Sequence, residues 1–282
     1  MKMTKPRRPV NAPSKQSVTS YPESWSRHLP ALVGPANLRV AGYETAIEIT
    51  AAQLERVYFP LLALLANATE HGRRVVAGLA GIPGSGKSTF AAALARAAGR
   101  VLGPGDFAVV GMDGWHLSNA VLDQRTTRDA TGRVIPLRQR KGSPESFDVE
   151  ALAAALRRLR TADREVALPV YDRRRHDPVP DALTVSGRTR IVLVEGNYLL
   201  IDTPPWNEVS ALLHPKLLLE CDPAVACERT VARHVRGGFA PQEAAARFEA
   251  NDRLNTETVL GANARADIRV QLSPEPRILQ RD

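Results

Sequence analysis

The stretch GIPGSGKST at residues 81–89 decides the fold of this chain. It fills the pattern G-x-x-x-x-G-K-[ST], whose glycines let backbone N–H groups turn inward around a phosphate group. An apolar run at residues 75–80 precedes the stretch, and an alanine-rich helical pattern at residues 86–100 follows it. We therefore predict a strand, a phosphate-binding loop (P-loop) and a helix whose positive end points at the anion. This pattern indicates binding of a nucleoside triphosphate.

Two side chains of the loop have expected roles in nucleotide binding. Lys87 supplies a positive charge for the β- and γ-phosphate oxygens, and the Ser88 hydroxyl group can ligate Mg²⁺. The alternative, a glycine-rich turn without a ligand, is disfavoured by the strand and helix that flank the loop. The expected nucleotide-binding residues are Gly81, Ile82, Pro83, Gly84, Ser85, Gly86, Lys87, Ser88 and Thr89.

Short apolar runs alternate with helical patterns along the rest of the chain. The runs lie at residues 107–112, 190–200, 216–222 and 266–272, and helices are expected after Asp148, after Asp222 and from Pro241. Strands that are apolar throughout and alternate with helices are typical of a parallel sheet covered on both faces. We predict an α/β chain with the three-layer fold of P-loop NTPases, a mainly parallel sheet flanked by helices, and a helical N-terminal extension.

Three segments are expected along the chain. Residues 1–37 are rich in proline, serine and basic residues, which predicts a disordered basic tail. Residues 38–72 predict a helical extension capped by Thr50 and ended by Gly72, with a kink or a split at Pro60. Residues 73–282 predict the P-loop domain.

Composition and charge limit the function classes. No apolar run reaches the roughly 18 residues of a membrane span, and no secretory signal follows the basic start. The two cysteines, Cys221 and Cys227, suit reduced thiols in a cytoplasm. Five of the eight net positive charges fall before residue 29, so a nucleic-acid partner is disfavoured for the body of the chain. We expect a cytoplasmic protein with no membrane partner.

Two carboxylates stand where apolar runs end. Asp113 follows one run, between Gly111 and Gly114, and Glu195 ends another in RIVLVEG. Because ligands gather at the carboxyl ends of strands in α/β sheets, both should face the P-loop. Glu195 is expected to hold Mg²⁺ beside Ser88. Asp113 is a candidate general base, or an acceptor that orients a hydroxyl group for phosphoryl transfer. A turn-forming aspartate and a loop glutamate are the alternatives.

Other classes of P-loop protein carry different sequence motifs. The chain has neither the N-K-x-D sequence of GTPases nor the L-S-G-G-Q sequence of transport ATPases. With Asp113 at the second strand, this favours phosphoryl transfer to a hydroxyl group. The rival hypothesis is an ATPase whose nucleotide state regulates a partner protein through the N-terminal extension. Nucleic-acid binding by the basic tail is a third, weaker hypothesis.

Four stretches together resemble the P-loop small-molecule kinases grouped with uridine kinase, phosphoribulokinase and bacterial pantothenate kinase. They are GIPGSGKST, VGMDGWHLSN, KGSPESFDVEAL with PVYDRRRHDPVP, and VLVEGNYLL. The chain is most similar to bacterial relatives described as nucleoside/nucleotide kinase-like or fructose-transport-system kinase-like. The stretch YFPLL also resembles D-glycerate 3-kinases. The resemblance implies an ATP- and Mg²⁺-dependent kinase whose acceptor is a small metabolite: a sugar, a nucleoside, or a pantothenate-like or glycerate-like compound.

The resemblance also implies roles for particular residues. Asp113 matches the catalytic base, and Glu195 matches the residue that serves the metal. Tyr171 and His176 match positions that line the acceptor pocket. The helix after ECDP matches a lid that closes over the phosphates, and its arginines Arg229, Arg233 and Arg236 are candidates for contacting them, Arg233 first.

Where uridine kinases usually carry an aromatic-rich stretch, this chain has WHLSN after Asp113. That departure weakens nucleoside specificity, and Trp115 and His116 either contact substrate or pack in the interior. If some of the basic residues nearby line the pocket, an anionic acceptor is expected, a sugar phosphate or a carboxylate; singly, each is more typical of exposed surface. These residues are Arg138, Arg140, Lys141, Arg173, Arg174 and Arg175. The sequence does not decide the identity of the acceptor or whether the chain forms a homodimer.

Overall fold

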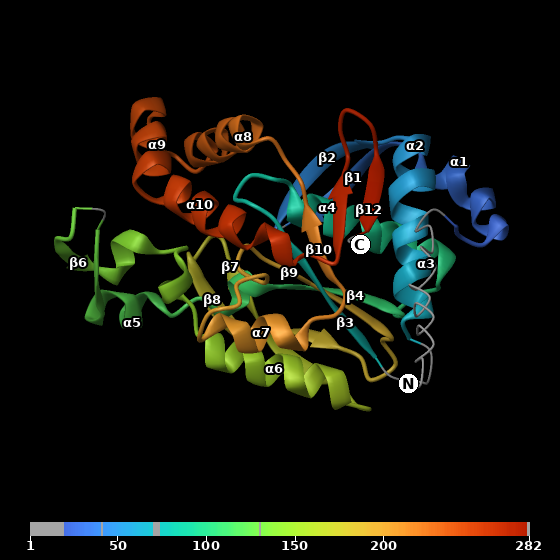
Figure 1. Ribbon diagram of the computed structural model, residues 1–282, viewed down its shortest axis with the longest axis horizontal. Coiled ribbons are helices and arrows are strands. Elements are labelled where there is room, and N and C mark those ends of the chain that lie inside the picture. Colours follow the sequence, from blue (N-terminus) through green and yellow to red (C-terminus); the bar gives the residue numbers. More distant parts are fainter. Residues whose placement is uncertain (1–19, 41, 70–73, 130, 281–282) are drawn as a thin grey trace, which may run out of the picture.

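Helices cover both faces of a six-stranded sheet, as the computed structural model shows (Figure 1). The structure describes residues 20–40, 42–69, 74–129 and 131–280. The strand order is β12-β11-β10-β3-β9-β4, and all neighbouring strands are parallel except β11 and β12. The strands are β3 (Val75–Ala80), β4 (Phe107–Gly111), β9 (Ile191–Glu195), β10 (Lys216–Leu219), β11 (Ile268–Gln271) and β12 (Arg277–Gln280). The predicted fold class, an α/β protein with a mainly parallel sheet, is confirmed.

The central strand β3 is buried at every position because both of its faces are covered. Val76 and Ala80 join one hydrophobic cluster with α6 (Val149–Thr161) and α7 (Trp206–Leu212). The alternate residues of β3 join a second cluster with α3 (Phe59–Asn67) and α4 (Lys87–Val101). Each large aliphatic side chain so buried contributes about 1.5–3 kcal/mol to folding. This two-sided burial explains why the strand sequence is continuously apolar.

The position of β3 in the sheet places the loop that follows it. Strand β3 lies between β9 and β10, and the chain leaves it through α4 to reach β4 on the far side of β9. A ligand crevice forms at such a point, where connections run to opposite sides of a parallel sheet. Helices α8 (Pro223–Arg236), α9 (Pro241–Arg247) and α10 (Arg253–Ala262) lie beside the carboxyl edge. The other α-helices are α1 (Leu29–Leu32), α2 (Ala51–Gln53) and α5 (Asn119–Gln124).

Two predicted helix starts have the expected caps. The Asp148 carboxylate accepts a hydrogen bond from the N–H group of Ala151 at the start of α6. The Asp222 carboxylate accepts one from the N–H group of Ala224 at the start of α8, where Pro223 holds the first helical position. Both side chains therefore satisfy backbone donors that a helix start leaves without partners.

The N-terminal segment is less helical than predicted. Residues 38–49 were expected in a helix, but β1 (Gly34–Val40) and β2 (Tyr43–Ile49) form an antiparallel hairpin. Burial alternates along β1, and Leu38 packs against the cluster around α3 and α4 while Pro35, Asn37 and Arg39 are exposed. That period of two overrides the local helix preference. The predicted end of the extension at Gly72 lies outside the described residues.

The predicted disordered tail, residues 1–37, is too long at its C-terminal end. Residues 1–19 lie outside the described part of the chain, but the segment from Tyr21 packs on the protein. The rings of Tyr21 and Trp25 meet Phe59 edge to face at 5.2 and 6.0 Å between centroids. These aromatic contacts add to the apolar burial that orders the segment.

The helix around Pro60 is interrupted, as its proline predicts. A π-helical turn, η2 (Leu54–Tyr58), separates α2 from α3, and the N–H group of Phe59 donates to the carbonyl oxygen of Leu54. Pro60 has no N–H group to offer the preceding turn, and the backbone widens just before it. The Thr50 cap of this helix is confirmed.

Two hairpins at the carboxyl edge of the sheet were not predicted. Strands β5 (Thr126–Arg128) and β6 (Val134–Pro136) lie within the expected polar loop, beside α5 and a small cluster of Leu117, Leu122 and Leu137. Strands β7 (Val166–Asp172) and β8 (Asp177–Val185) form the second hairpin. In the described ranges, no helix is both long enough and apolar enough to cross a lipid bilayer.

Candidate active site

The loop between β3 and α4 has the geometry of a phosphate cradle. Gly84 and Gly86 have φ angles of 79° and 91°, in the left-handed region that favours glycine. A Cβ atom at Gly84 would lie 2.1 Å from the carbonyl oxygen of Ala226, so α8 packs directly on the loop. The Ser85 hydroxyl oxygen is buried without a hydrogen-bond partner in the described structure. A buried donor of this kind fits a bound phosphate oxygen.

Lys87 begins α4 and folds back over the loop. Its Nζ atom donates to the carbonyl oxygen of Ile82 at 3.0 Å, and the residue is only 8% exposed. Burial lowers the Lys87 pKa to about 8, although the carboxylates of Glu195 and Asp113 favour the charged form. A bound phosphate would restore the missing counter-charge.

Ser88 and Glu195 join the P-loop to the neighbouring strand. The Ser88 hydroxyl donates to Glu195 Oε1 at 3.0 Å. Burial raises the Glu195 pKa, and the nearby Asp113 carboxylate raises it further. The described residues hold no group of three or more His, Cys, Asp or Glu side chains that could bind a metal ion. Two hard oxygen ligands beside a phosphate cradle still fit Mg²⁺, which usually binds one or two protein groups together with substrate phosphates and water.

Asp113 lies in the short helix η3 (Met112–Trp115), directly after β4. Gly111 stands opposite Glu195 in the strand register, so the two carboxylates come from adjacent strands at the same edge of the sheet. A Cβ atom at Gly114 would lie 2.4 Å from the carbonyl oxygen of Pro169. Glycine at this position therefore lets β7 pass close to Asp113 and brings the end of that strand to the site.

Arg173, at the end of the β7–β8 hairpin, pairs with Asp113. Its guanidinium donates to Asp113 Oδ2 at 2.5 Å, and both side chains are about one-third exposed. Burial alone would raise the Asp113 pKa, but Arg173 foremost, with His116 and Lys87, holds that pKa below its usual value. Asp113 is therefore charged at neutral pH.

His116 and Tyr171 form an aromatic wall beside Asp113. The His116 ring lies 4.0 Å from the Phe147 ring and 4.9 Å from the Tyr171 ring, between centroids. Its Nδ1 atom is 2.8 Å from the carbonyl oxygen of Asp113, which assigns the proton to Nδ1. Burial lowers the His116 pKa and outweighs Asp113, which favours the charged form, and the cations Lys141 and Arg173 lower that pKa further. Burial also raises the Tyr171 pKa to about 12. Both rings are neutral at neutral pH.

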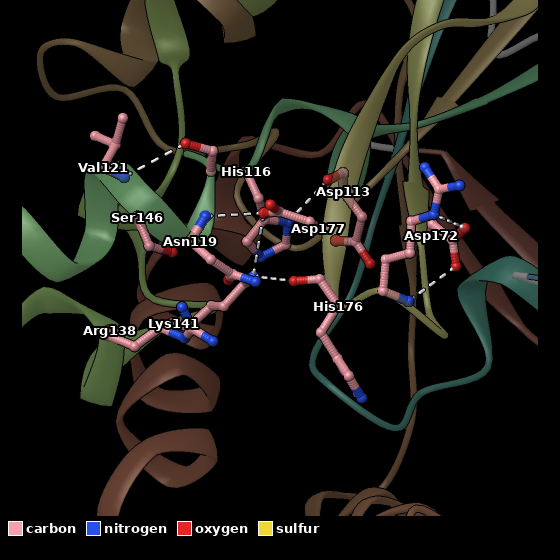
Figure 2. A network of polar contacts seen from close by, with 12 residues as sticks. Asp113, His116, Asn119, Val121, Arg138, Lys141, Ser146, Asp172, His176 and Asp177 are labelled. Carbon is pink, nitrogen blue, oxygen red and sulfur yellow. Dashed lines mark hydrogen bonds and ion pairs between the residues drawn. The ribbon is translucent and has the colours of Figure 1, made fainter.

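Lys141 reaches the same wall from the loop after β6 (Figure 2). Its ammonium group donates to Asn119 Oδ1 at 2.6 Å and to the carbonyl oxygen of His176 at 2.5 Å, and it lies 4.0 Å from Asp177 Oδ1. The Asp177 carboxylate also accepts from the N–H group of Asn119 at 2.9 Å. Burial lowers the Lys141 pKa to about 8. These contacts fix the position of the ammonium group.

Helix α8 carries the three predicted lid arginines. Arg229 lies beside the loop, since a Cβ atom at Gly86 would be 4.0 Å from its Nη1 atom. Arg233 and Arg236 are both exposed. Desolvation and the nearby Arg173 lower the Arg233 pKa. Arg229 thus lies beside the contact that Ala226 and Thr230 make with the P-loop, and Arg233 follows about one helical turn later on α8.

A π-helical turn, η6 (Phe248–Asp252), ties α8 to the Lys141 segment. The Nε2 atom of His234 on α8 lies 2.8 Å from Asp252 Oδ2. Asn251 in the same turn donates to the carbonyl oxygen of Lys141 at 3.0 Å and accepts from Arg140 at 2.7 Å. The lid helix and the segment beside Asp113 are therefore held by one polar network.

A cavity of about 440 Å³ opens beside the P-loop at the ends of β10 and β11. Ile82 of the loop forms one wall. The other lining residues include Glu220, Asp222, Asn263, Gln271 and Ser273, which offer both donors and acceptors. The cavity is large enough for the nucleoside part of a nucleotide.

The structure groups most of the residues proposed from sequence. The P-loop, Ser88, Glu195, Asp113, His116 and Tyr171 all meet at the carboxyl edge of the sheet. His176 differs, because its side chain is exposed and only its carbonyl oxygen faces Lys141. Trp115 is 5% exposed and packs in the core, so of its two alternatives the interior one holds.

The basic residues near the pocket separate into two groups. Lys141 and Arg173 face the site, whereas Arg138 pairs with Asp123 and Arg140 binds Asn251. The side chains of Arg174 and Arg175 are exposed. Sequence reasoning missed Asn119 and Asp177, which hold Lys141, because no spacing links residues so far apart in the chain.

Comparison with known proteins shows which family this chain resembles. The model of the phosphoribulokinase/uridine kinase family matches residues 76–274. The Escherichia coli (strain K12) protein YggC is 33% identical over 242 residues, which cover 85% of this chain and 96% of YggC. A Schizosaccharomyces pombe protein named as a candidate uridine kinase is 35% identical over 189 residues, 66% of this chain and 78% of that protein.

A solved structure agrees with these sequence matches. It comes from Silicibacter sp. TM1040 and is described as a candidate fructose transport system kinase. The two structures superpose with a TM-score of 0.62 at 33% sequence identity, and the match covers 72% of this chain and 94% of the other. The similarity therefore extends over most of both chains.

Proposed function

This chain belongs to the phosphoribulokinase/uridine kinase family and is an ATP-dependent small-molecule kinase, and we propose that it transfers the γ-phosphoryl group of Mg²⁺–ATP to a hydroxyl group of a metabolite at Asp113. One observation carries the proposal. Asp113 stands next to the Ser88–Glu195 pair at the edge of the sheet where the P-loop opens. A carboxylate in this place can take the proton of an acceptor hydroxyl.

The P-loop would hold the triphosphate. The backbone N–H groups of residues 81–89 and the orphaned Ser85 hydroxyl would donate to phosphate oxygens. Lys87 would turn from the Ile82 carbonyl oxygen to the β- and γ-phosphates, and Arg229 and Arg233 would close over them from α8. We place the nucleoside part in the cavity beside Ile82, because this cavity adjoins the loop.

Ser88 and Glu195 would hold the metal ion. Mg²⁺ would neutralise charge on the β- and γ-phosphate oxygens. The hydrogen bond between Ser88 and Glu195 shows that both oxygens can approach one point, and a shared metal would replace that bond. Burial first and the Asp113 carboxylate second raise the Glu195 pKa, and a bound cation would offset both effects.

The transfer itself requires a hydroxyl group directed at Asp113. The acceptor oxygen forms the new bond to the γ-phosphorus, the bond from that phosphorus to the β-phosphate oxygen breaks, and ADP leaves. Asp113 receives the hydroxyl proton. Arg233 and Lys87 would stabilise the charge on the transferred group. A cytoplasmic location is part of this proposal, and the two free cysteines are consistent with it.

The acceptor class is tested by ADP release from purified protein with Mg²⁺–ATP. The panel holds uridine, cytidine, pantothenate, glycerate, free sugars, sugar alcohols and sugar phosphates. We expect one class to raise ADP release well above the basal rate. Slow hydrolysis that no member of the panel changes would instead support an ATPase that regulates a partner protein.

A further inference from the structure

The acceptor side of the crevice carries two cations beside two carboxylates, one of which is the proposed base. Lys87, Arg229 and Arg233 face the expected triphosphate, and Glu195 and Ser88 face the metal. Lys141 and Arg173 remain on the acceptor side, together with Asp113 and with Asp177 behind Lys141. We propose that the acceptor is a hydroxy compound with a carboxylate or phosphate group, and that Arg173 and Lys141 bind this anionic group. The inference rests on the proposed function and names its substrate class.

The surroundings of Lys141 favour the binding of an anion. Its side chain is 12% exposed, and its two hydrogen-bond acceptors at 2.5 and 2.6 Å are neutral oxygens, of His176 and Asn119. The carboxylate that pairs with it, that of Asp177, is 4.0 Å away and also binds the Asn119 N–H group. A half-buried ammonium group with neutral contacts keeps most of its attraction for a ligand anion.

Both cations contact the ring of Tyr171. The Lys141 ammonium group lies 5.1 Å from the centre of that ring, and the Arg173 guanidinium carbon lies 5.3 Å from the same centre. Both cations therefore border the same ring, which faces His116 on the aromatic wall. Contact with an aromatic face leaves the N–H groups at the edges of both cations able to donate to a ligand.

Arg173 also explains why the anion would matter for catalysis. It binds Asp113 Oδ2 at 2.5 Å, so an acceptor hydroxyl that approaches the Asp113 carboxylate comes beside this guanidinium. A neutral acceptor gives the remaining N–H groups of Arg173 no charged partner. An anionic acceptor supplies one and so brings its own hydroxyl group to Asp113. Arg173 thus acts as a specificity residue that couples recognition to the base.

Because one guanidinium contacts the base and would also bind the anion, the acceptor's hydroxyl and anionic groups should be only a few bonds apart. Three compounds with one carbon skeleton test this: glycerol, which is neutral, glycerate, which has a carboxylate, and glycerol 3-phosphate. Their phosphorylation is measured with wild type, Arg173→Met, Lys141→Met and Arg174→Met. Arg174 is the matched control, as an adjacent arginine whose side chain is exposed.

We expect wild type to prefer an anionic member of the series in kcat/KM. Removing one charged hydrogen-bond donor should lower kcat/KM for that member by about 10- to 100-fold in Arg173→Met and Lys141→Met. The preference for that anion over glycerol, which is the ratio of the two kcat/KM values, should fall by about 10-fold or more in both variants, and Arg174→Met should keep the wild-type ratio. Whichever anion is preferred, carboxylate or phosphate, identifies the source of the negative charge. A wild type that uses glycerol as well as either anion overturns the inference and leaves the kinase assignment intact.

A binding measurement decides the inference even if none of the three compounds is phosphorylated. The protein is saturated with Mg²⁺–ADP so that the P-loop is filled, and inorganic phosphate and acetate are titrated by calorimetry. We expect wild type to bind one of them at least about 10-fold more tightly than Arg173→Met and Lys141→Met do. Equal binding by all variants, or no binding by wild type, contradicts the anion site. Failure of every acceptor in the larger panel, with this difference in binding preserved, would instead count against the proposed function alone.

Discussion

Ser88 on the first turn of α4 donates a hydrogen bond to Glu195 at the end of β9, with 3.0 Å between the two oxygens. This bond joins two elements that lie 107 residues apart in sequence. It places two oxygen atoms that could bind a metal ion at the mouth of the P-loop. Their proximity is the basis for the proposal that Mg²⁺ binds at this point of the crevice.

Replacing Glu195 should change the metal requirement more than nucleotide binding. In Glu195→Gln, we expect the Mg²⁺ concentration for half-maximal rate to rise by about 10-fold or more. Even residues that only hydrogen-bond to a metal ligand typically change metal affinity by about 10- to 100-fold when they are replaced. The measurement is the initial rate against free Mg²⁺ at saturating ATP. Glu165→Gln, which alters an exposed glutamate, is the control. An unchanged Mg²⁺ dependence in Glu195→Gln would remove Glu195 from the metal site.

Replacing Asp113 should separate chemistry from nucleotide binding. Asn keeps the shape of the side chain but cannot take a proton, so Asp113→Asn should lose about 10²–10⁴-fold in kcat. ATP affinity, measured by calorimetry, should stay within about 3-fold of wild type because Asp113 lies on the acceptor side. A similar loss of ATP affinity would indicate that Asp113 is structural or holds the metal.

Nucleotide affinity should fall at high pH because of Lys87. Its pKa of about 8 in the free protein means that the group is mostly charged at about pH 7 and mostly neutral at about pH 9.5. Bound phosphates favour the charged form, so binding takes up a proton above about pH 8. The dissociation constant of ADP should therefore be flat below that pH and rise toward tenfold per pH unit above it.

Two variants assign this pH dependence, measured by calorimetry across the same range. Lys87→Met should bind ADP weakly at every pH and lose the dependence. Lys141→Met should keep it, because the Lys141 pKa is also about 8 but its ammonium group lies on the acceptor side. Wild-type affinity that does not change with pH would contradict the role given to Lys87.

An alanine at Gly84 should displace the lid helix. The φ angle of Gly84 is 79°, and its Cβ atom would lie 2.1 Å from the Ala226 carbonyl oxygen and 2.5 Å from Thr230 Oγ1. We expect Gly84→Ala to lower the free energy of unfolding by about 1–3 kcal/mol and to weaken ATP binding. The control is Gly99→Ala on α4, where a Cβ atom meets nothing within 4 Å and should stabilise by about 0.5–1 kcal/mol. Urea unfolding of both variants checks this; equal stabilities would contradict the close approach of α8.

The sequence predicts the P-loop and the two strand-end carboxylates well, because each depends on local rules. The loop pattern fixes its own backbone shape, and the topology rule for parallel sheets brings Asp113 and Glu195 to the same edge. The hairpin of β1 and β2 was missed because a short alternating pattern next to a strong helical one can be read either way.

The acceptor side could not be derived from sequence. Arg173, Arg174 and Arg175 are chemically identical, and the turn of the β7–β8 hairpin, with His176 at a φ angle of 52°, determines which of them reaches Asp113. Lys141 contacts groups 22 and 35 residues away, at Asn119 and His176. Such contacts depend on how the loops fold over the edge of the sheet, which periodicity and spacing do not encode.

Single-turnover transfer from γ-³²P-labelled ATP tests the central claim most directly. The protein is mixed with Mg²⁺–ATP and the best acceptor, and the label is followed into the phosphorylated acceptor and into inorganic phosphate. We predict that most of the label enters the acceptor in wild type, and that Asp113→Asn slows this transfer by about 10²–10⁴-fold. If all of the label appears in inorganic phosphate, at a rate that no acceptor changes, the protein is an ATPase and not a kinase of a small hydroxyl compound.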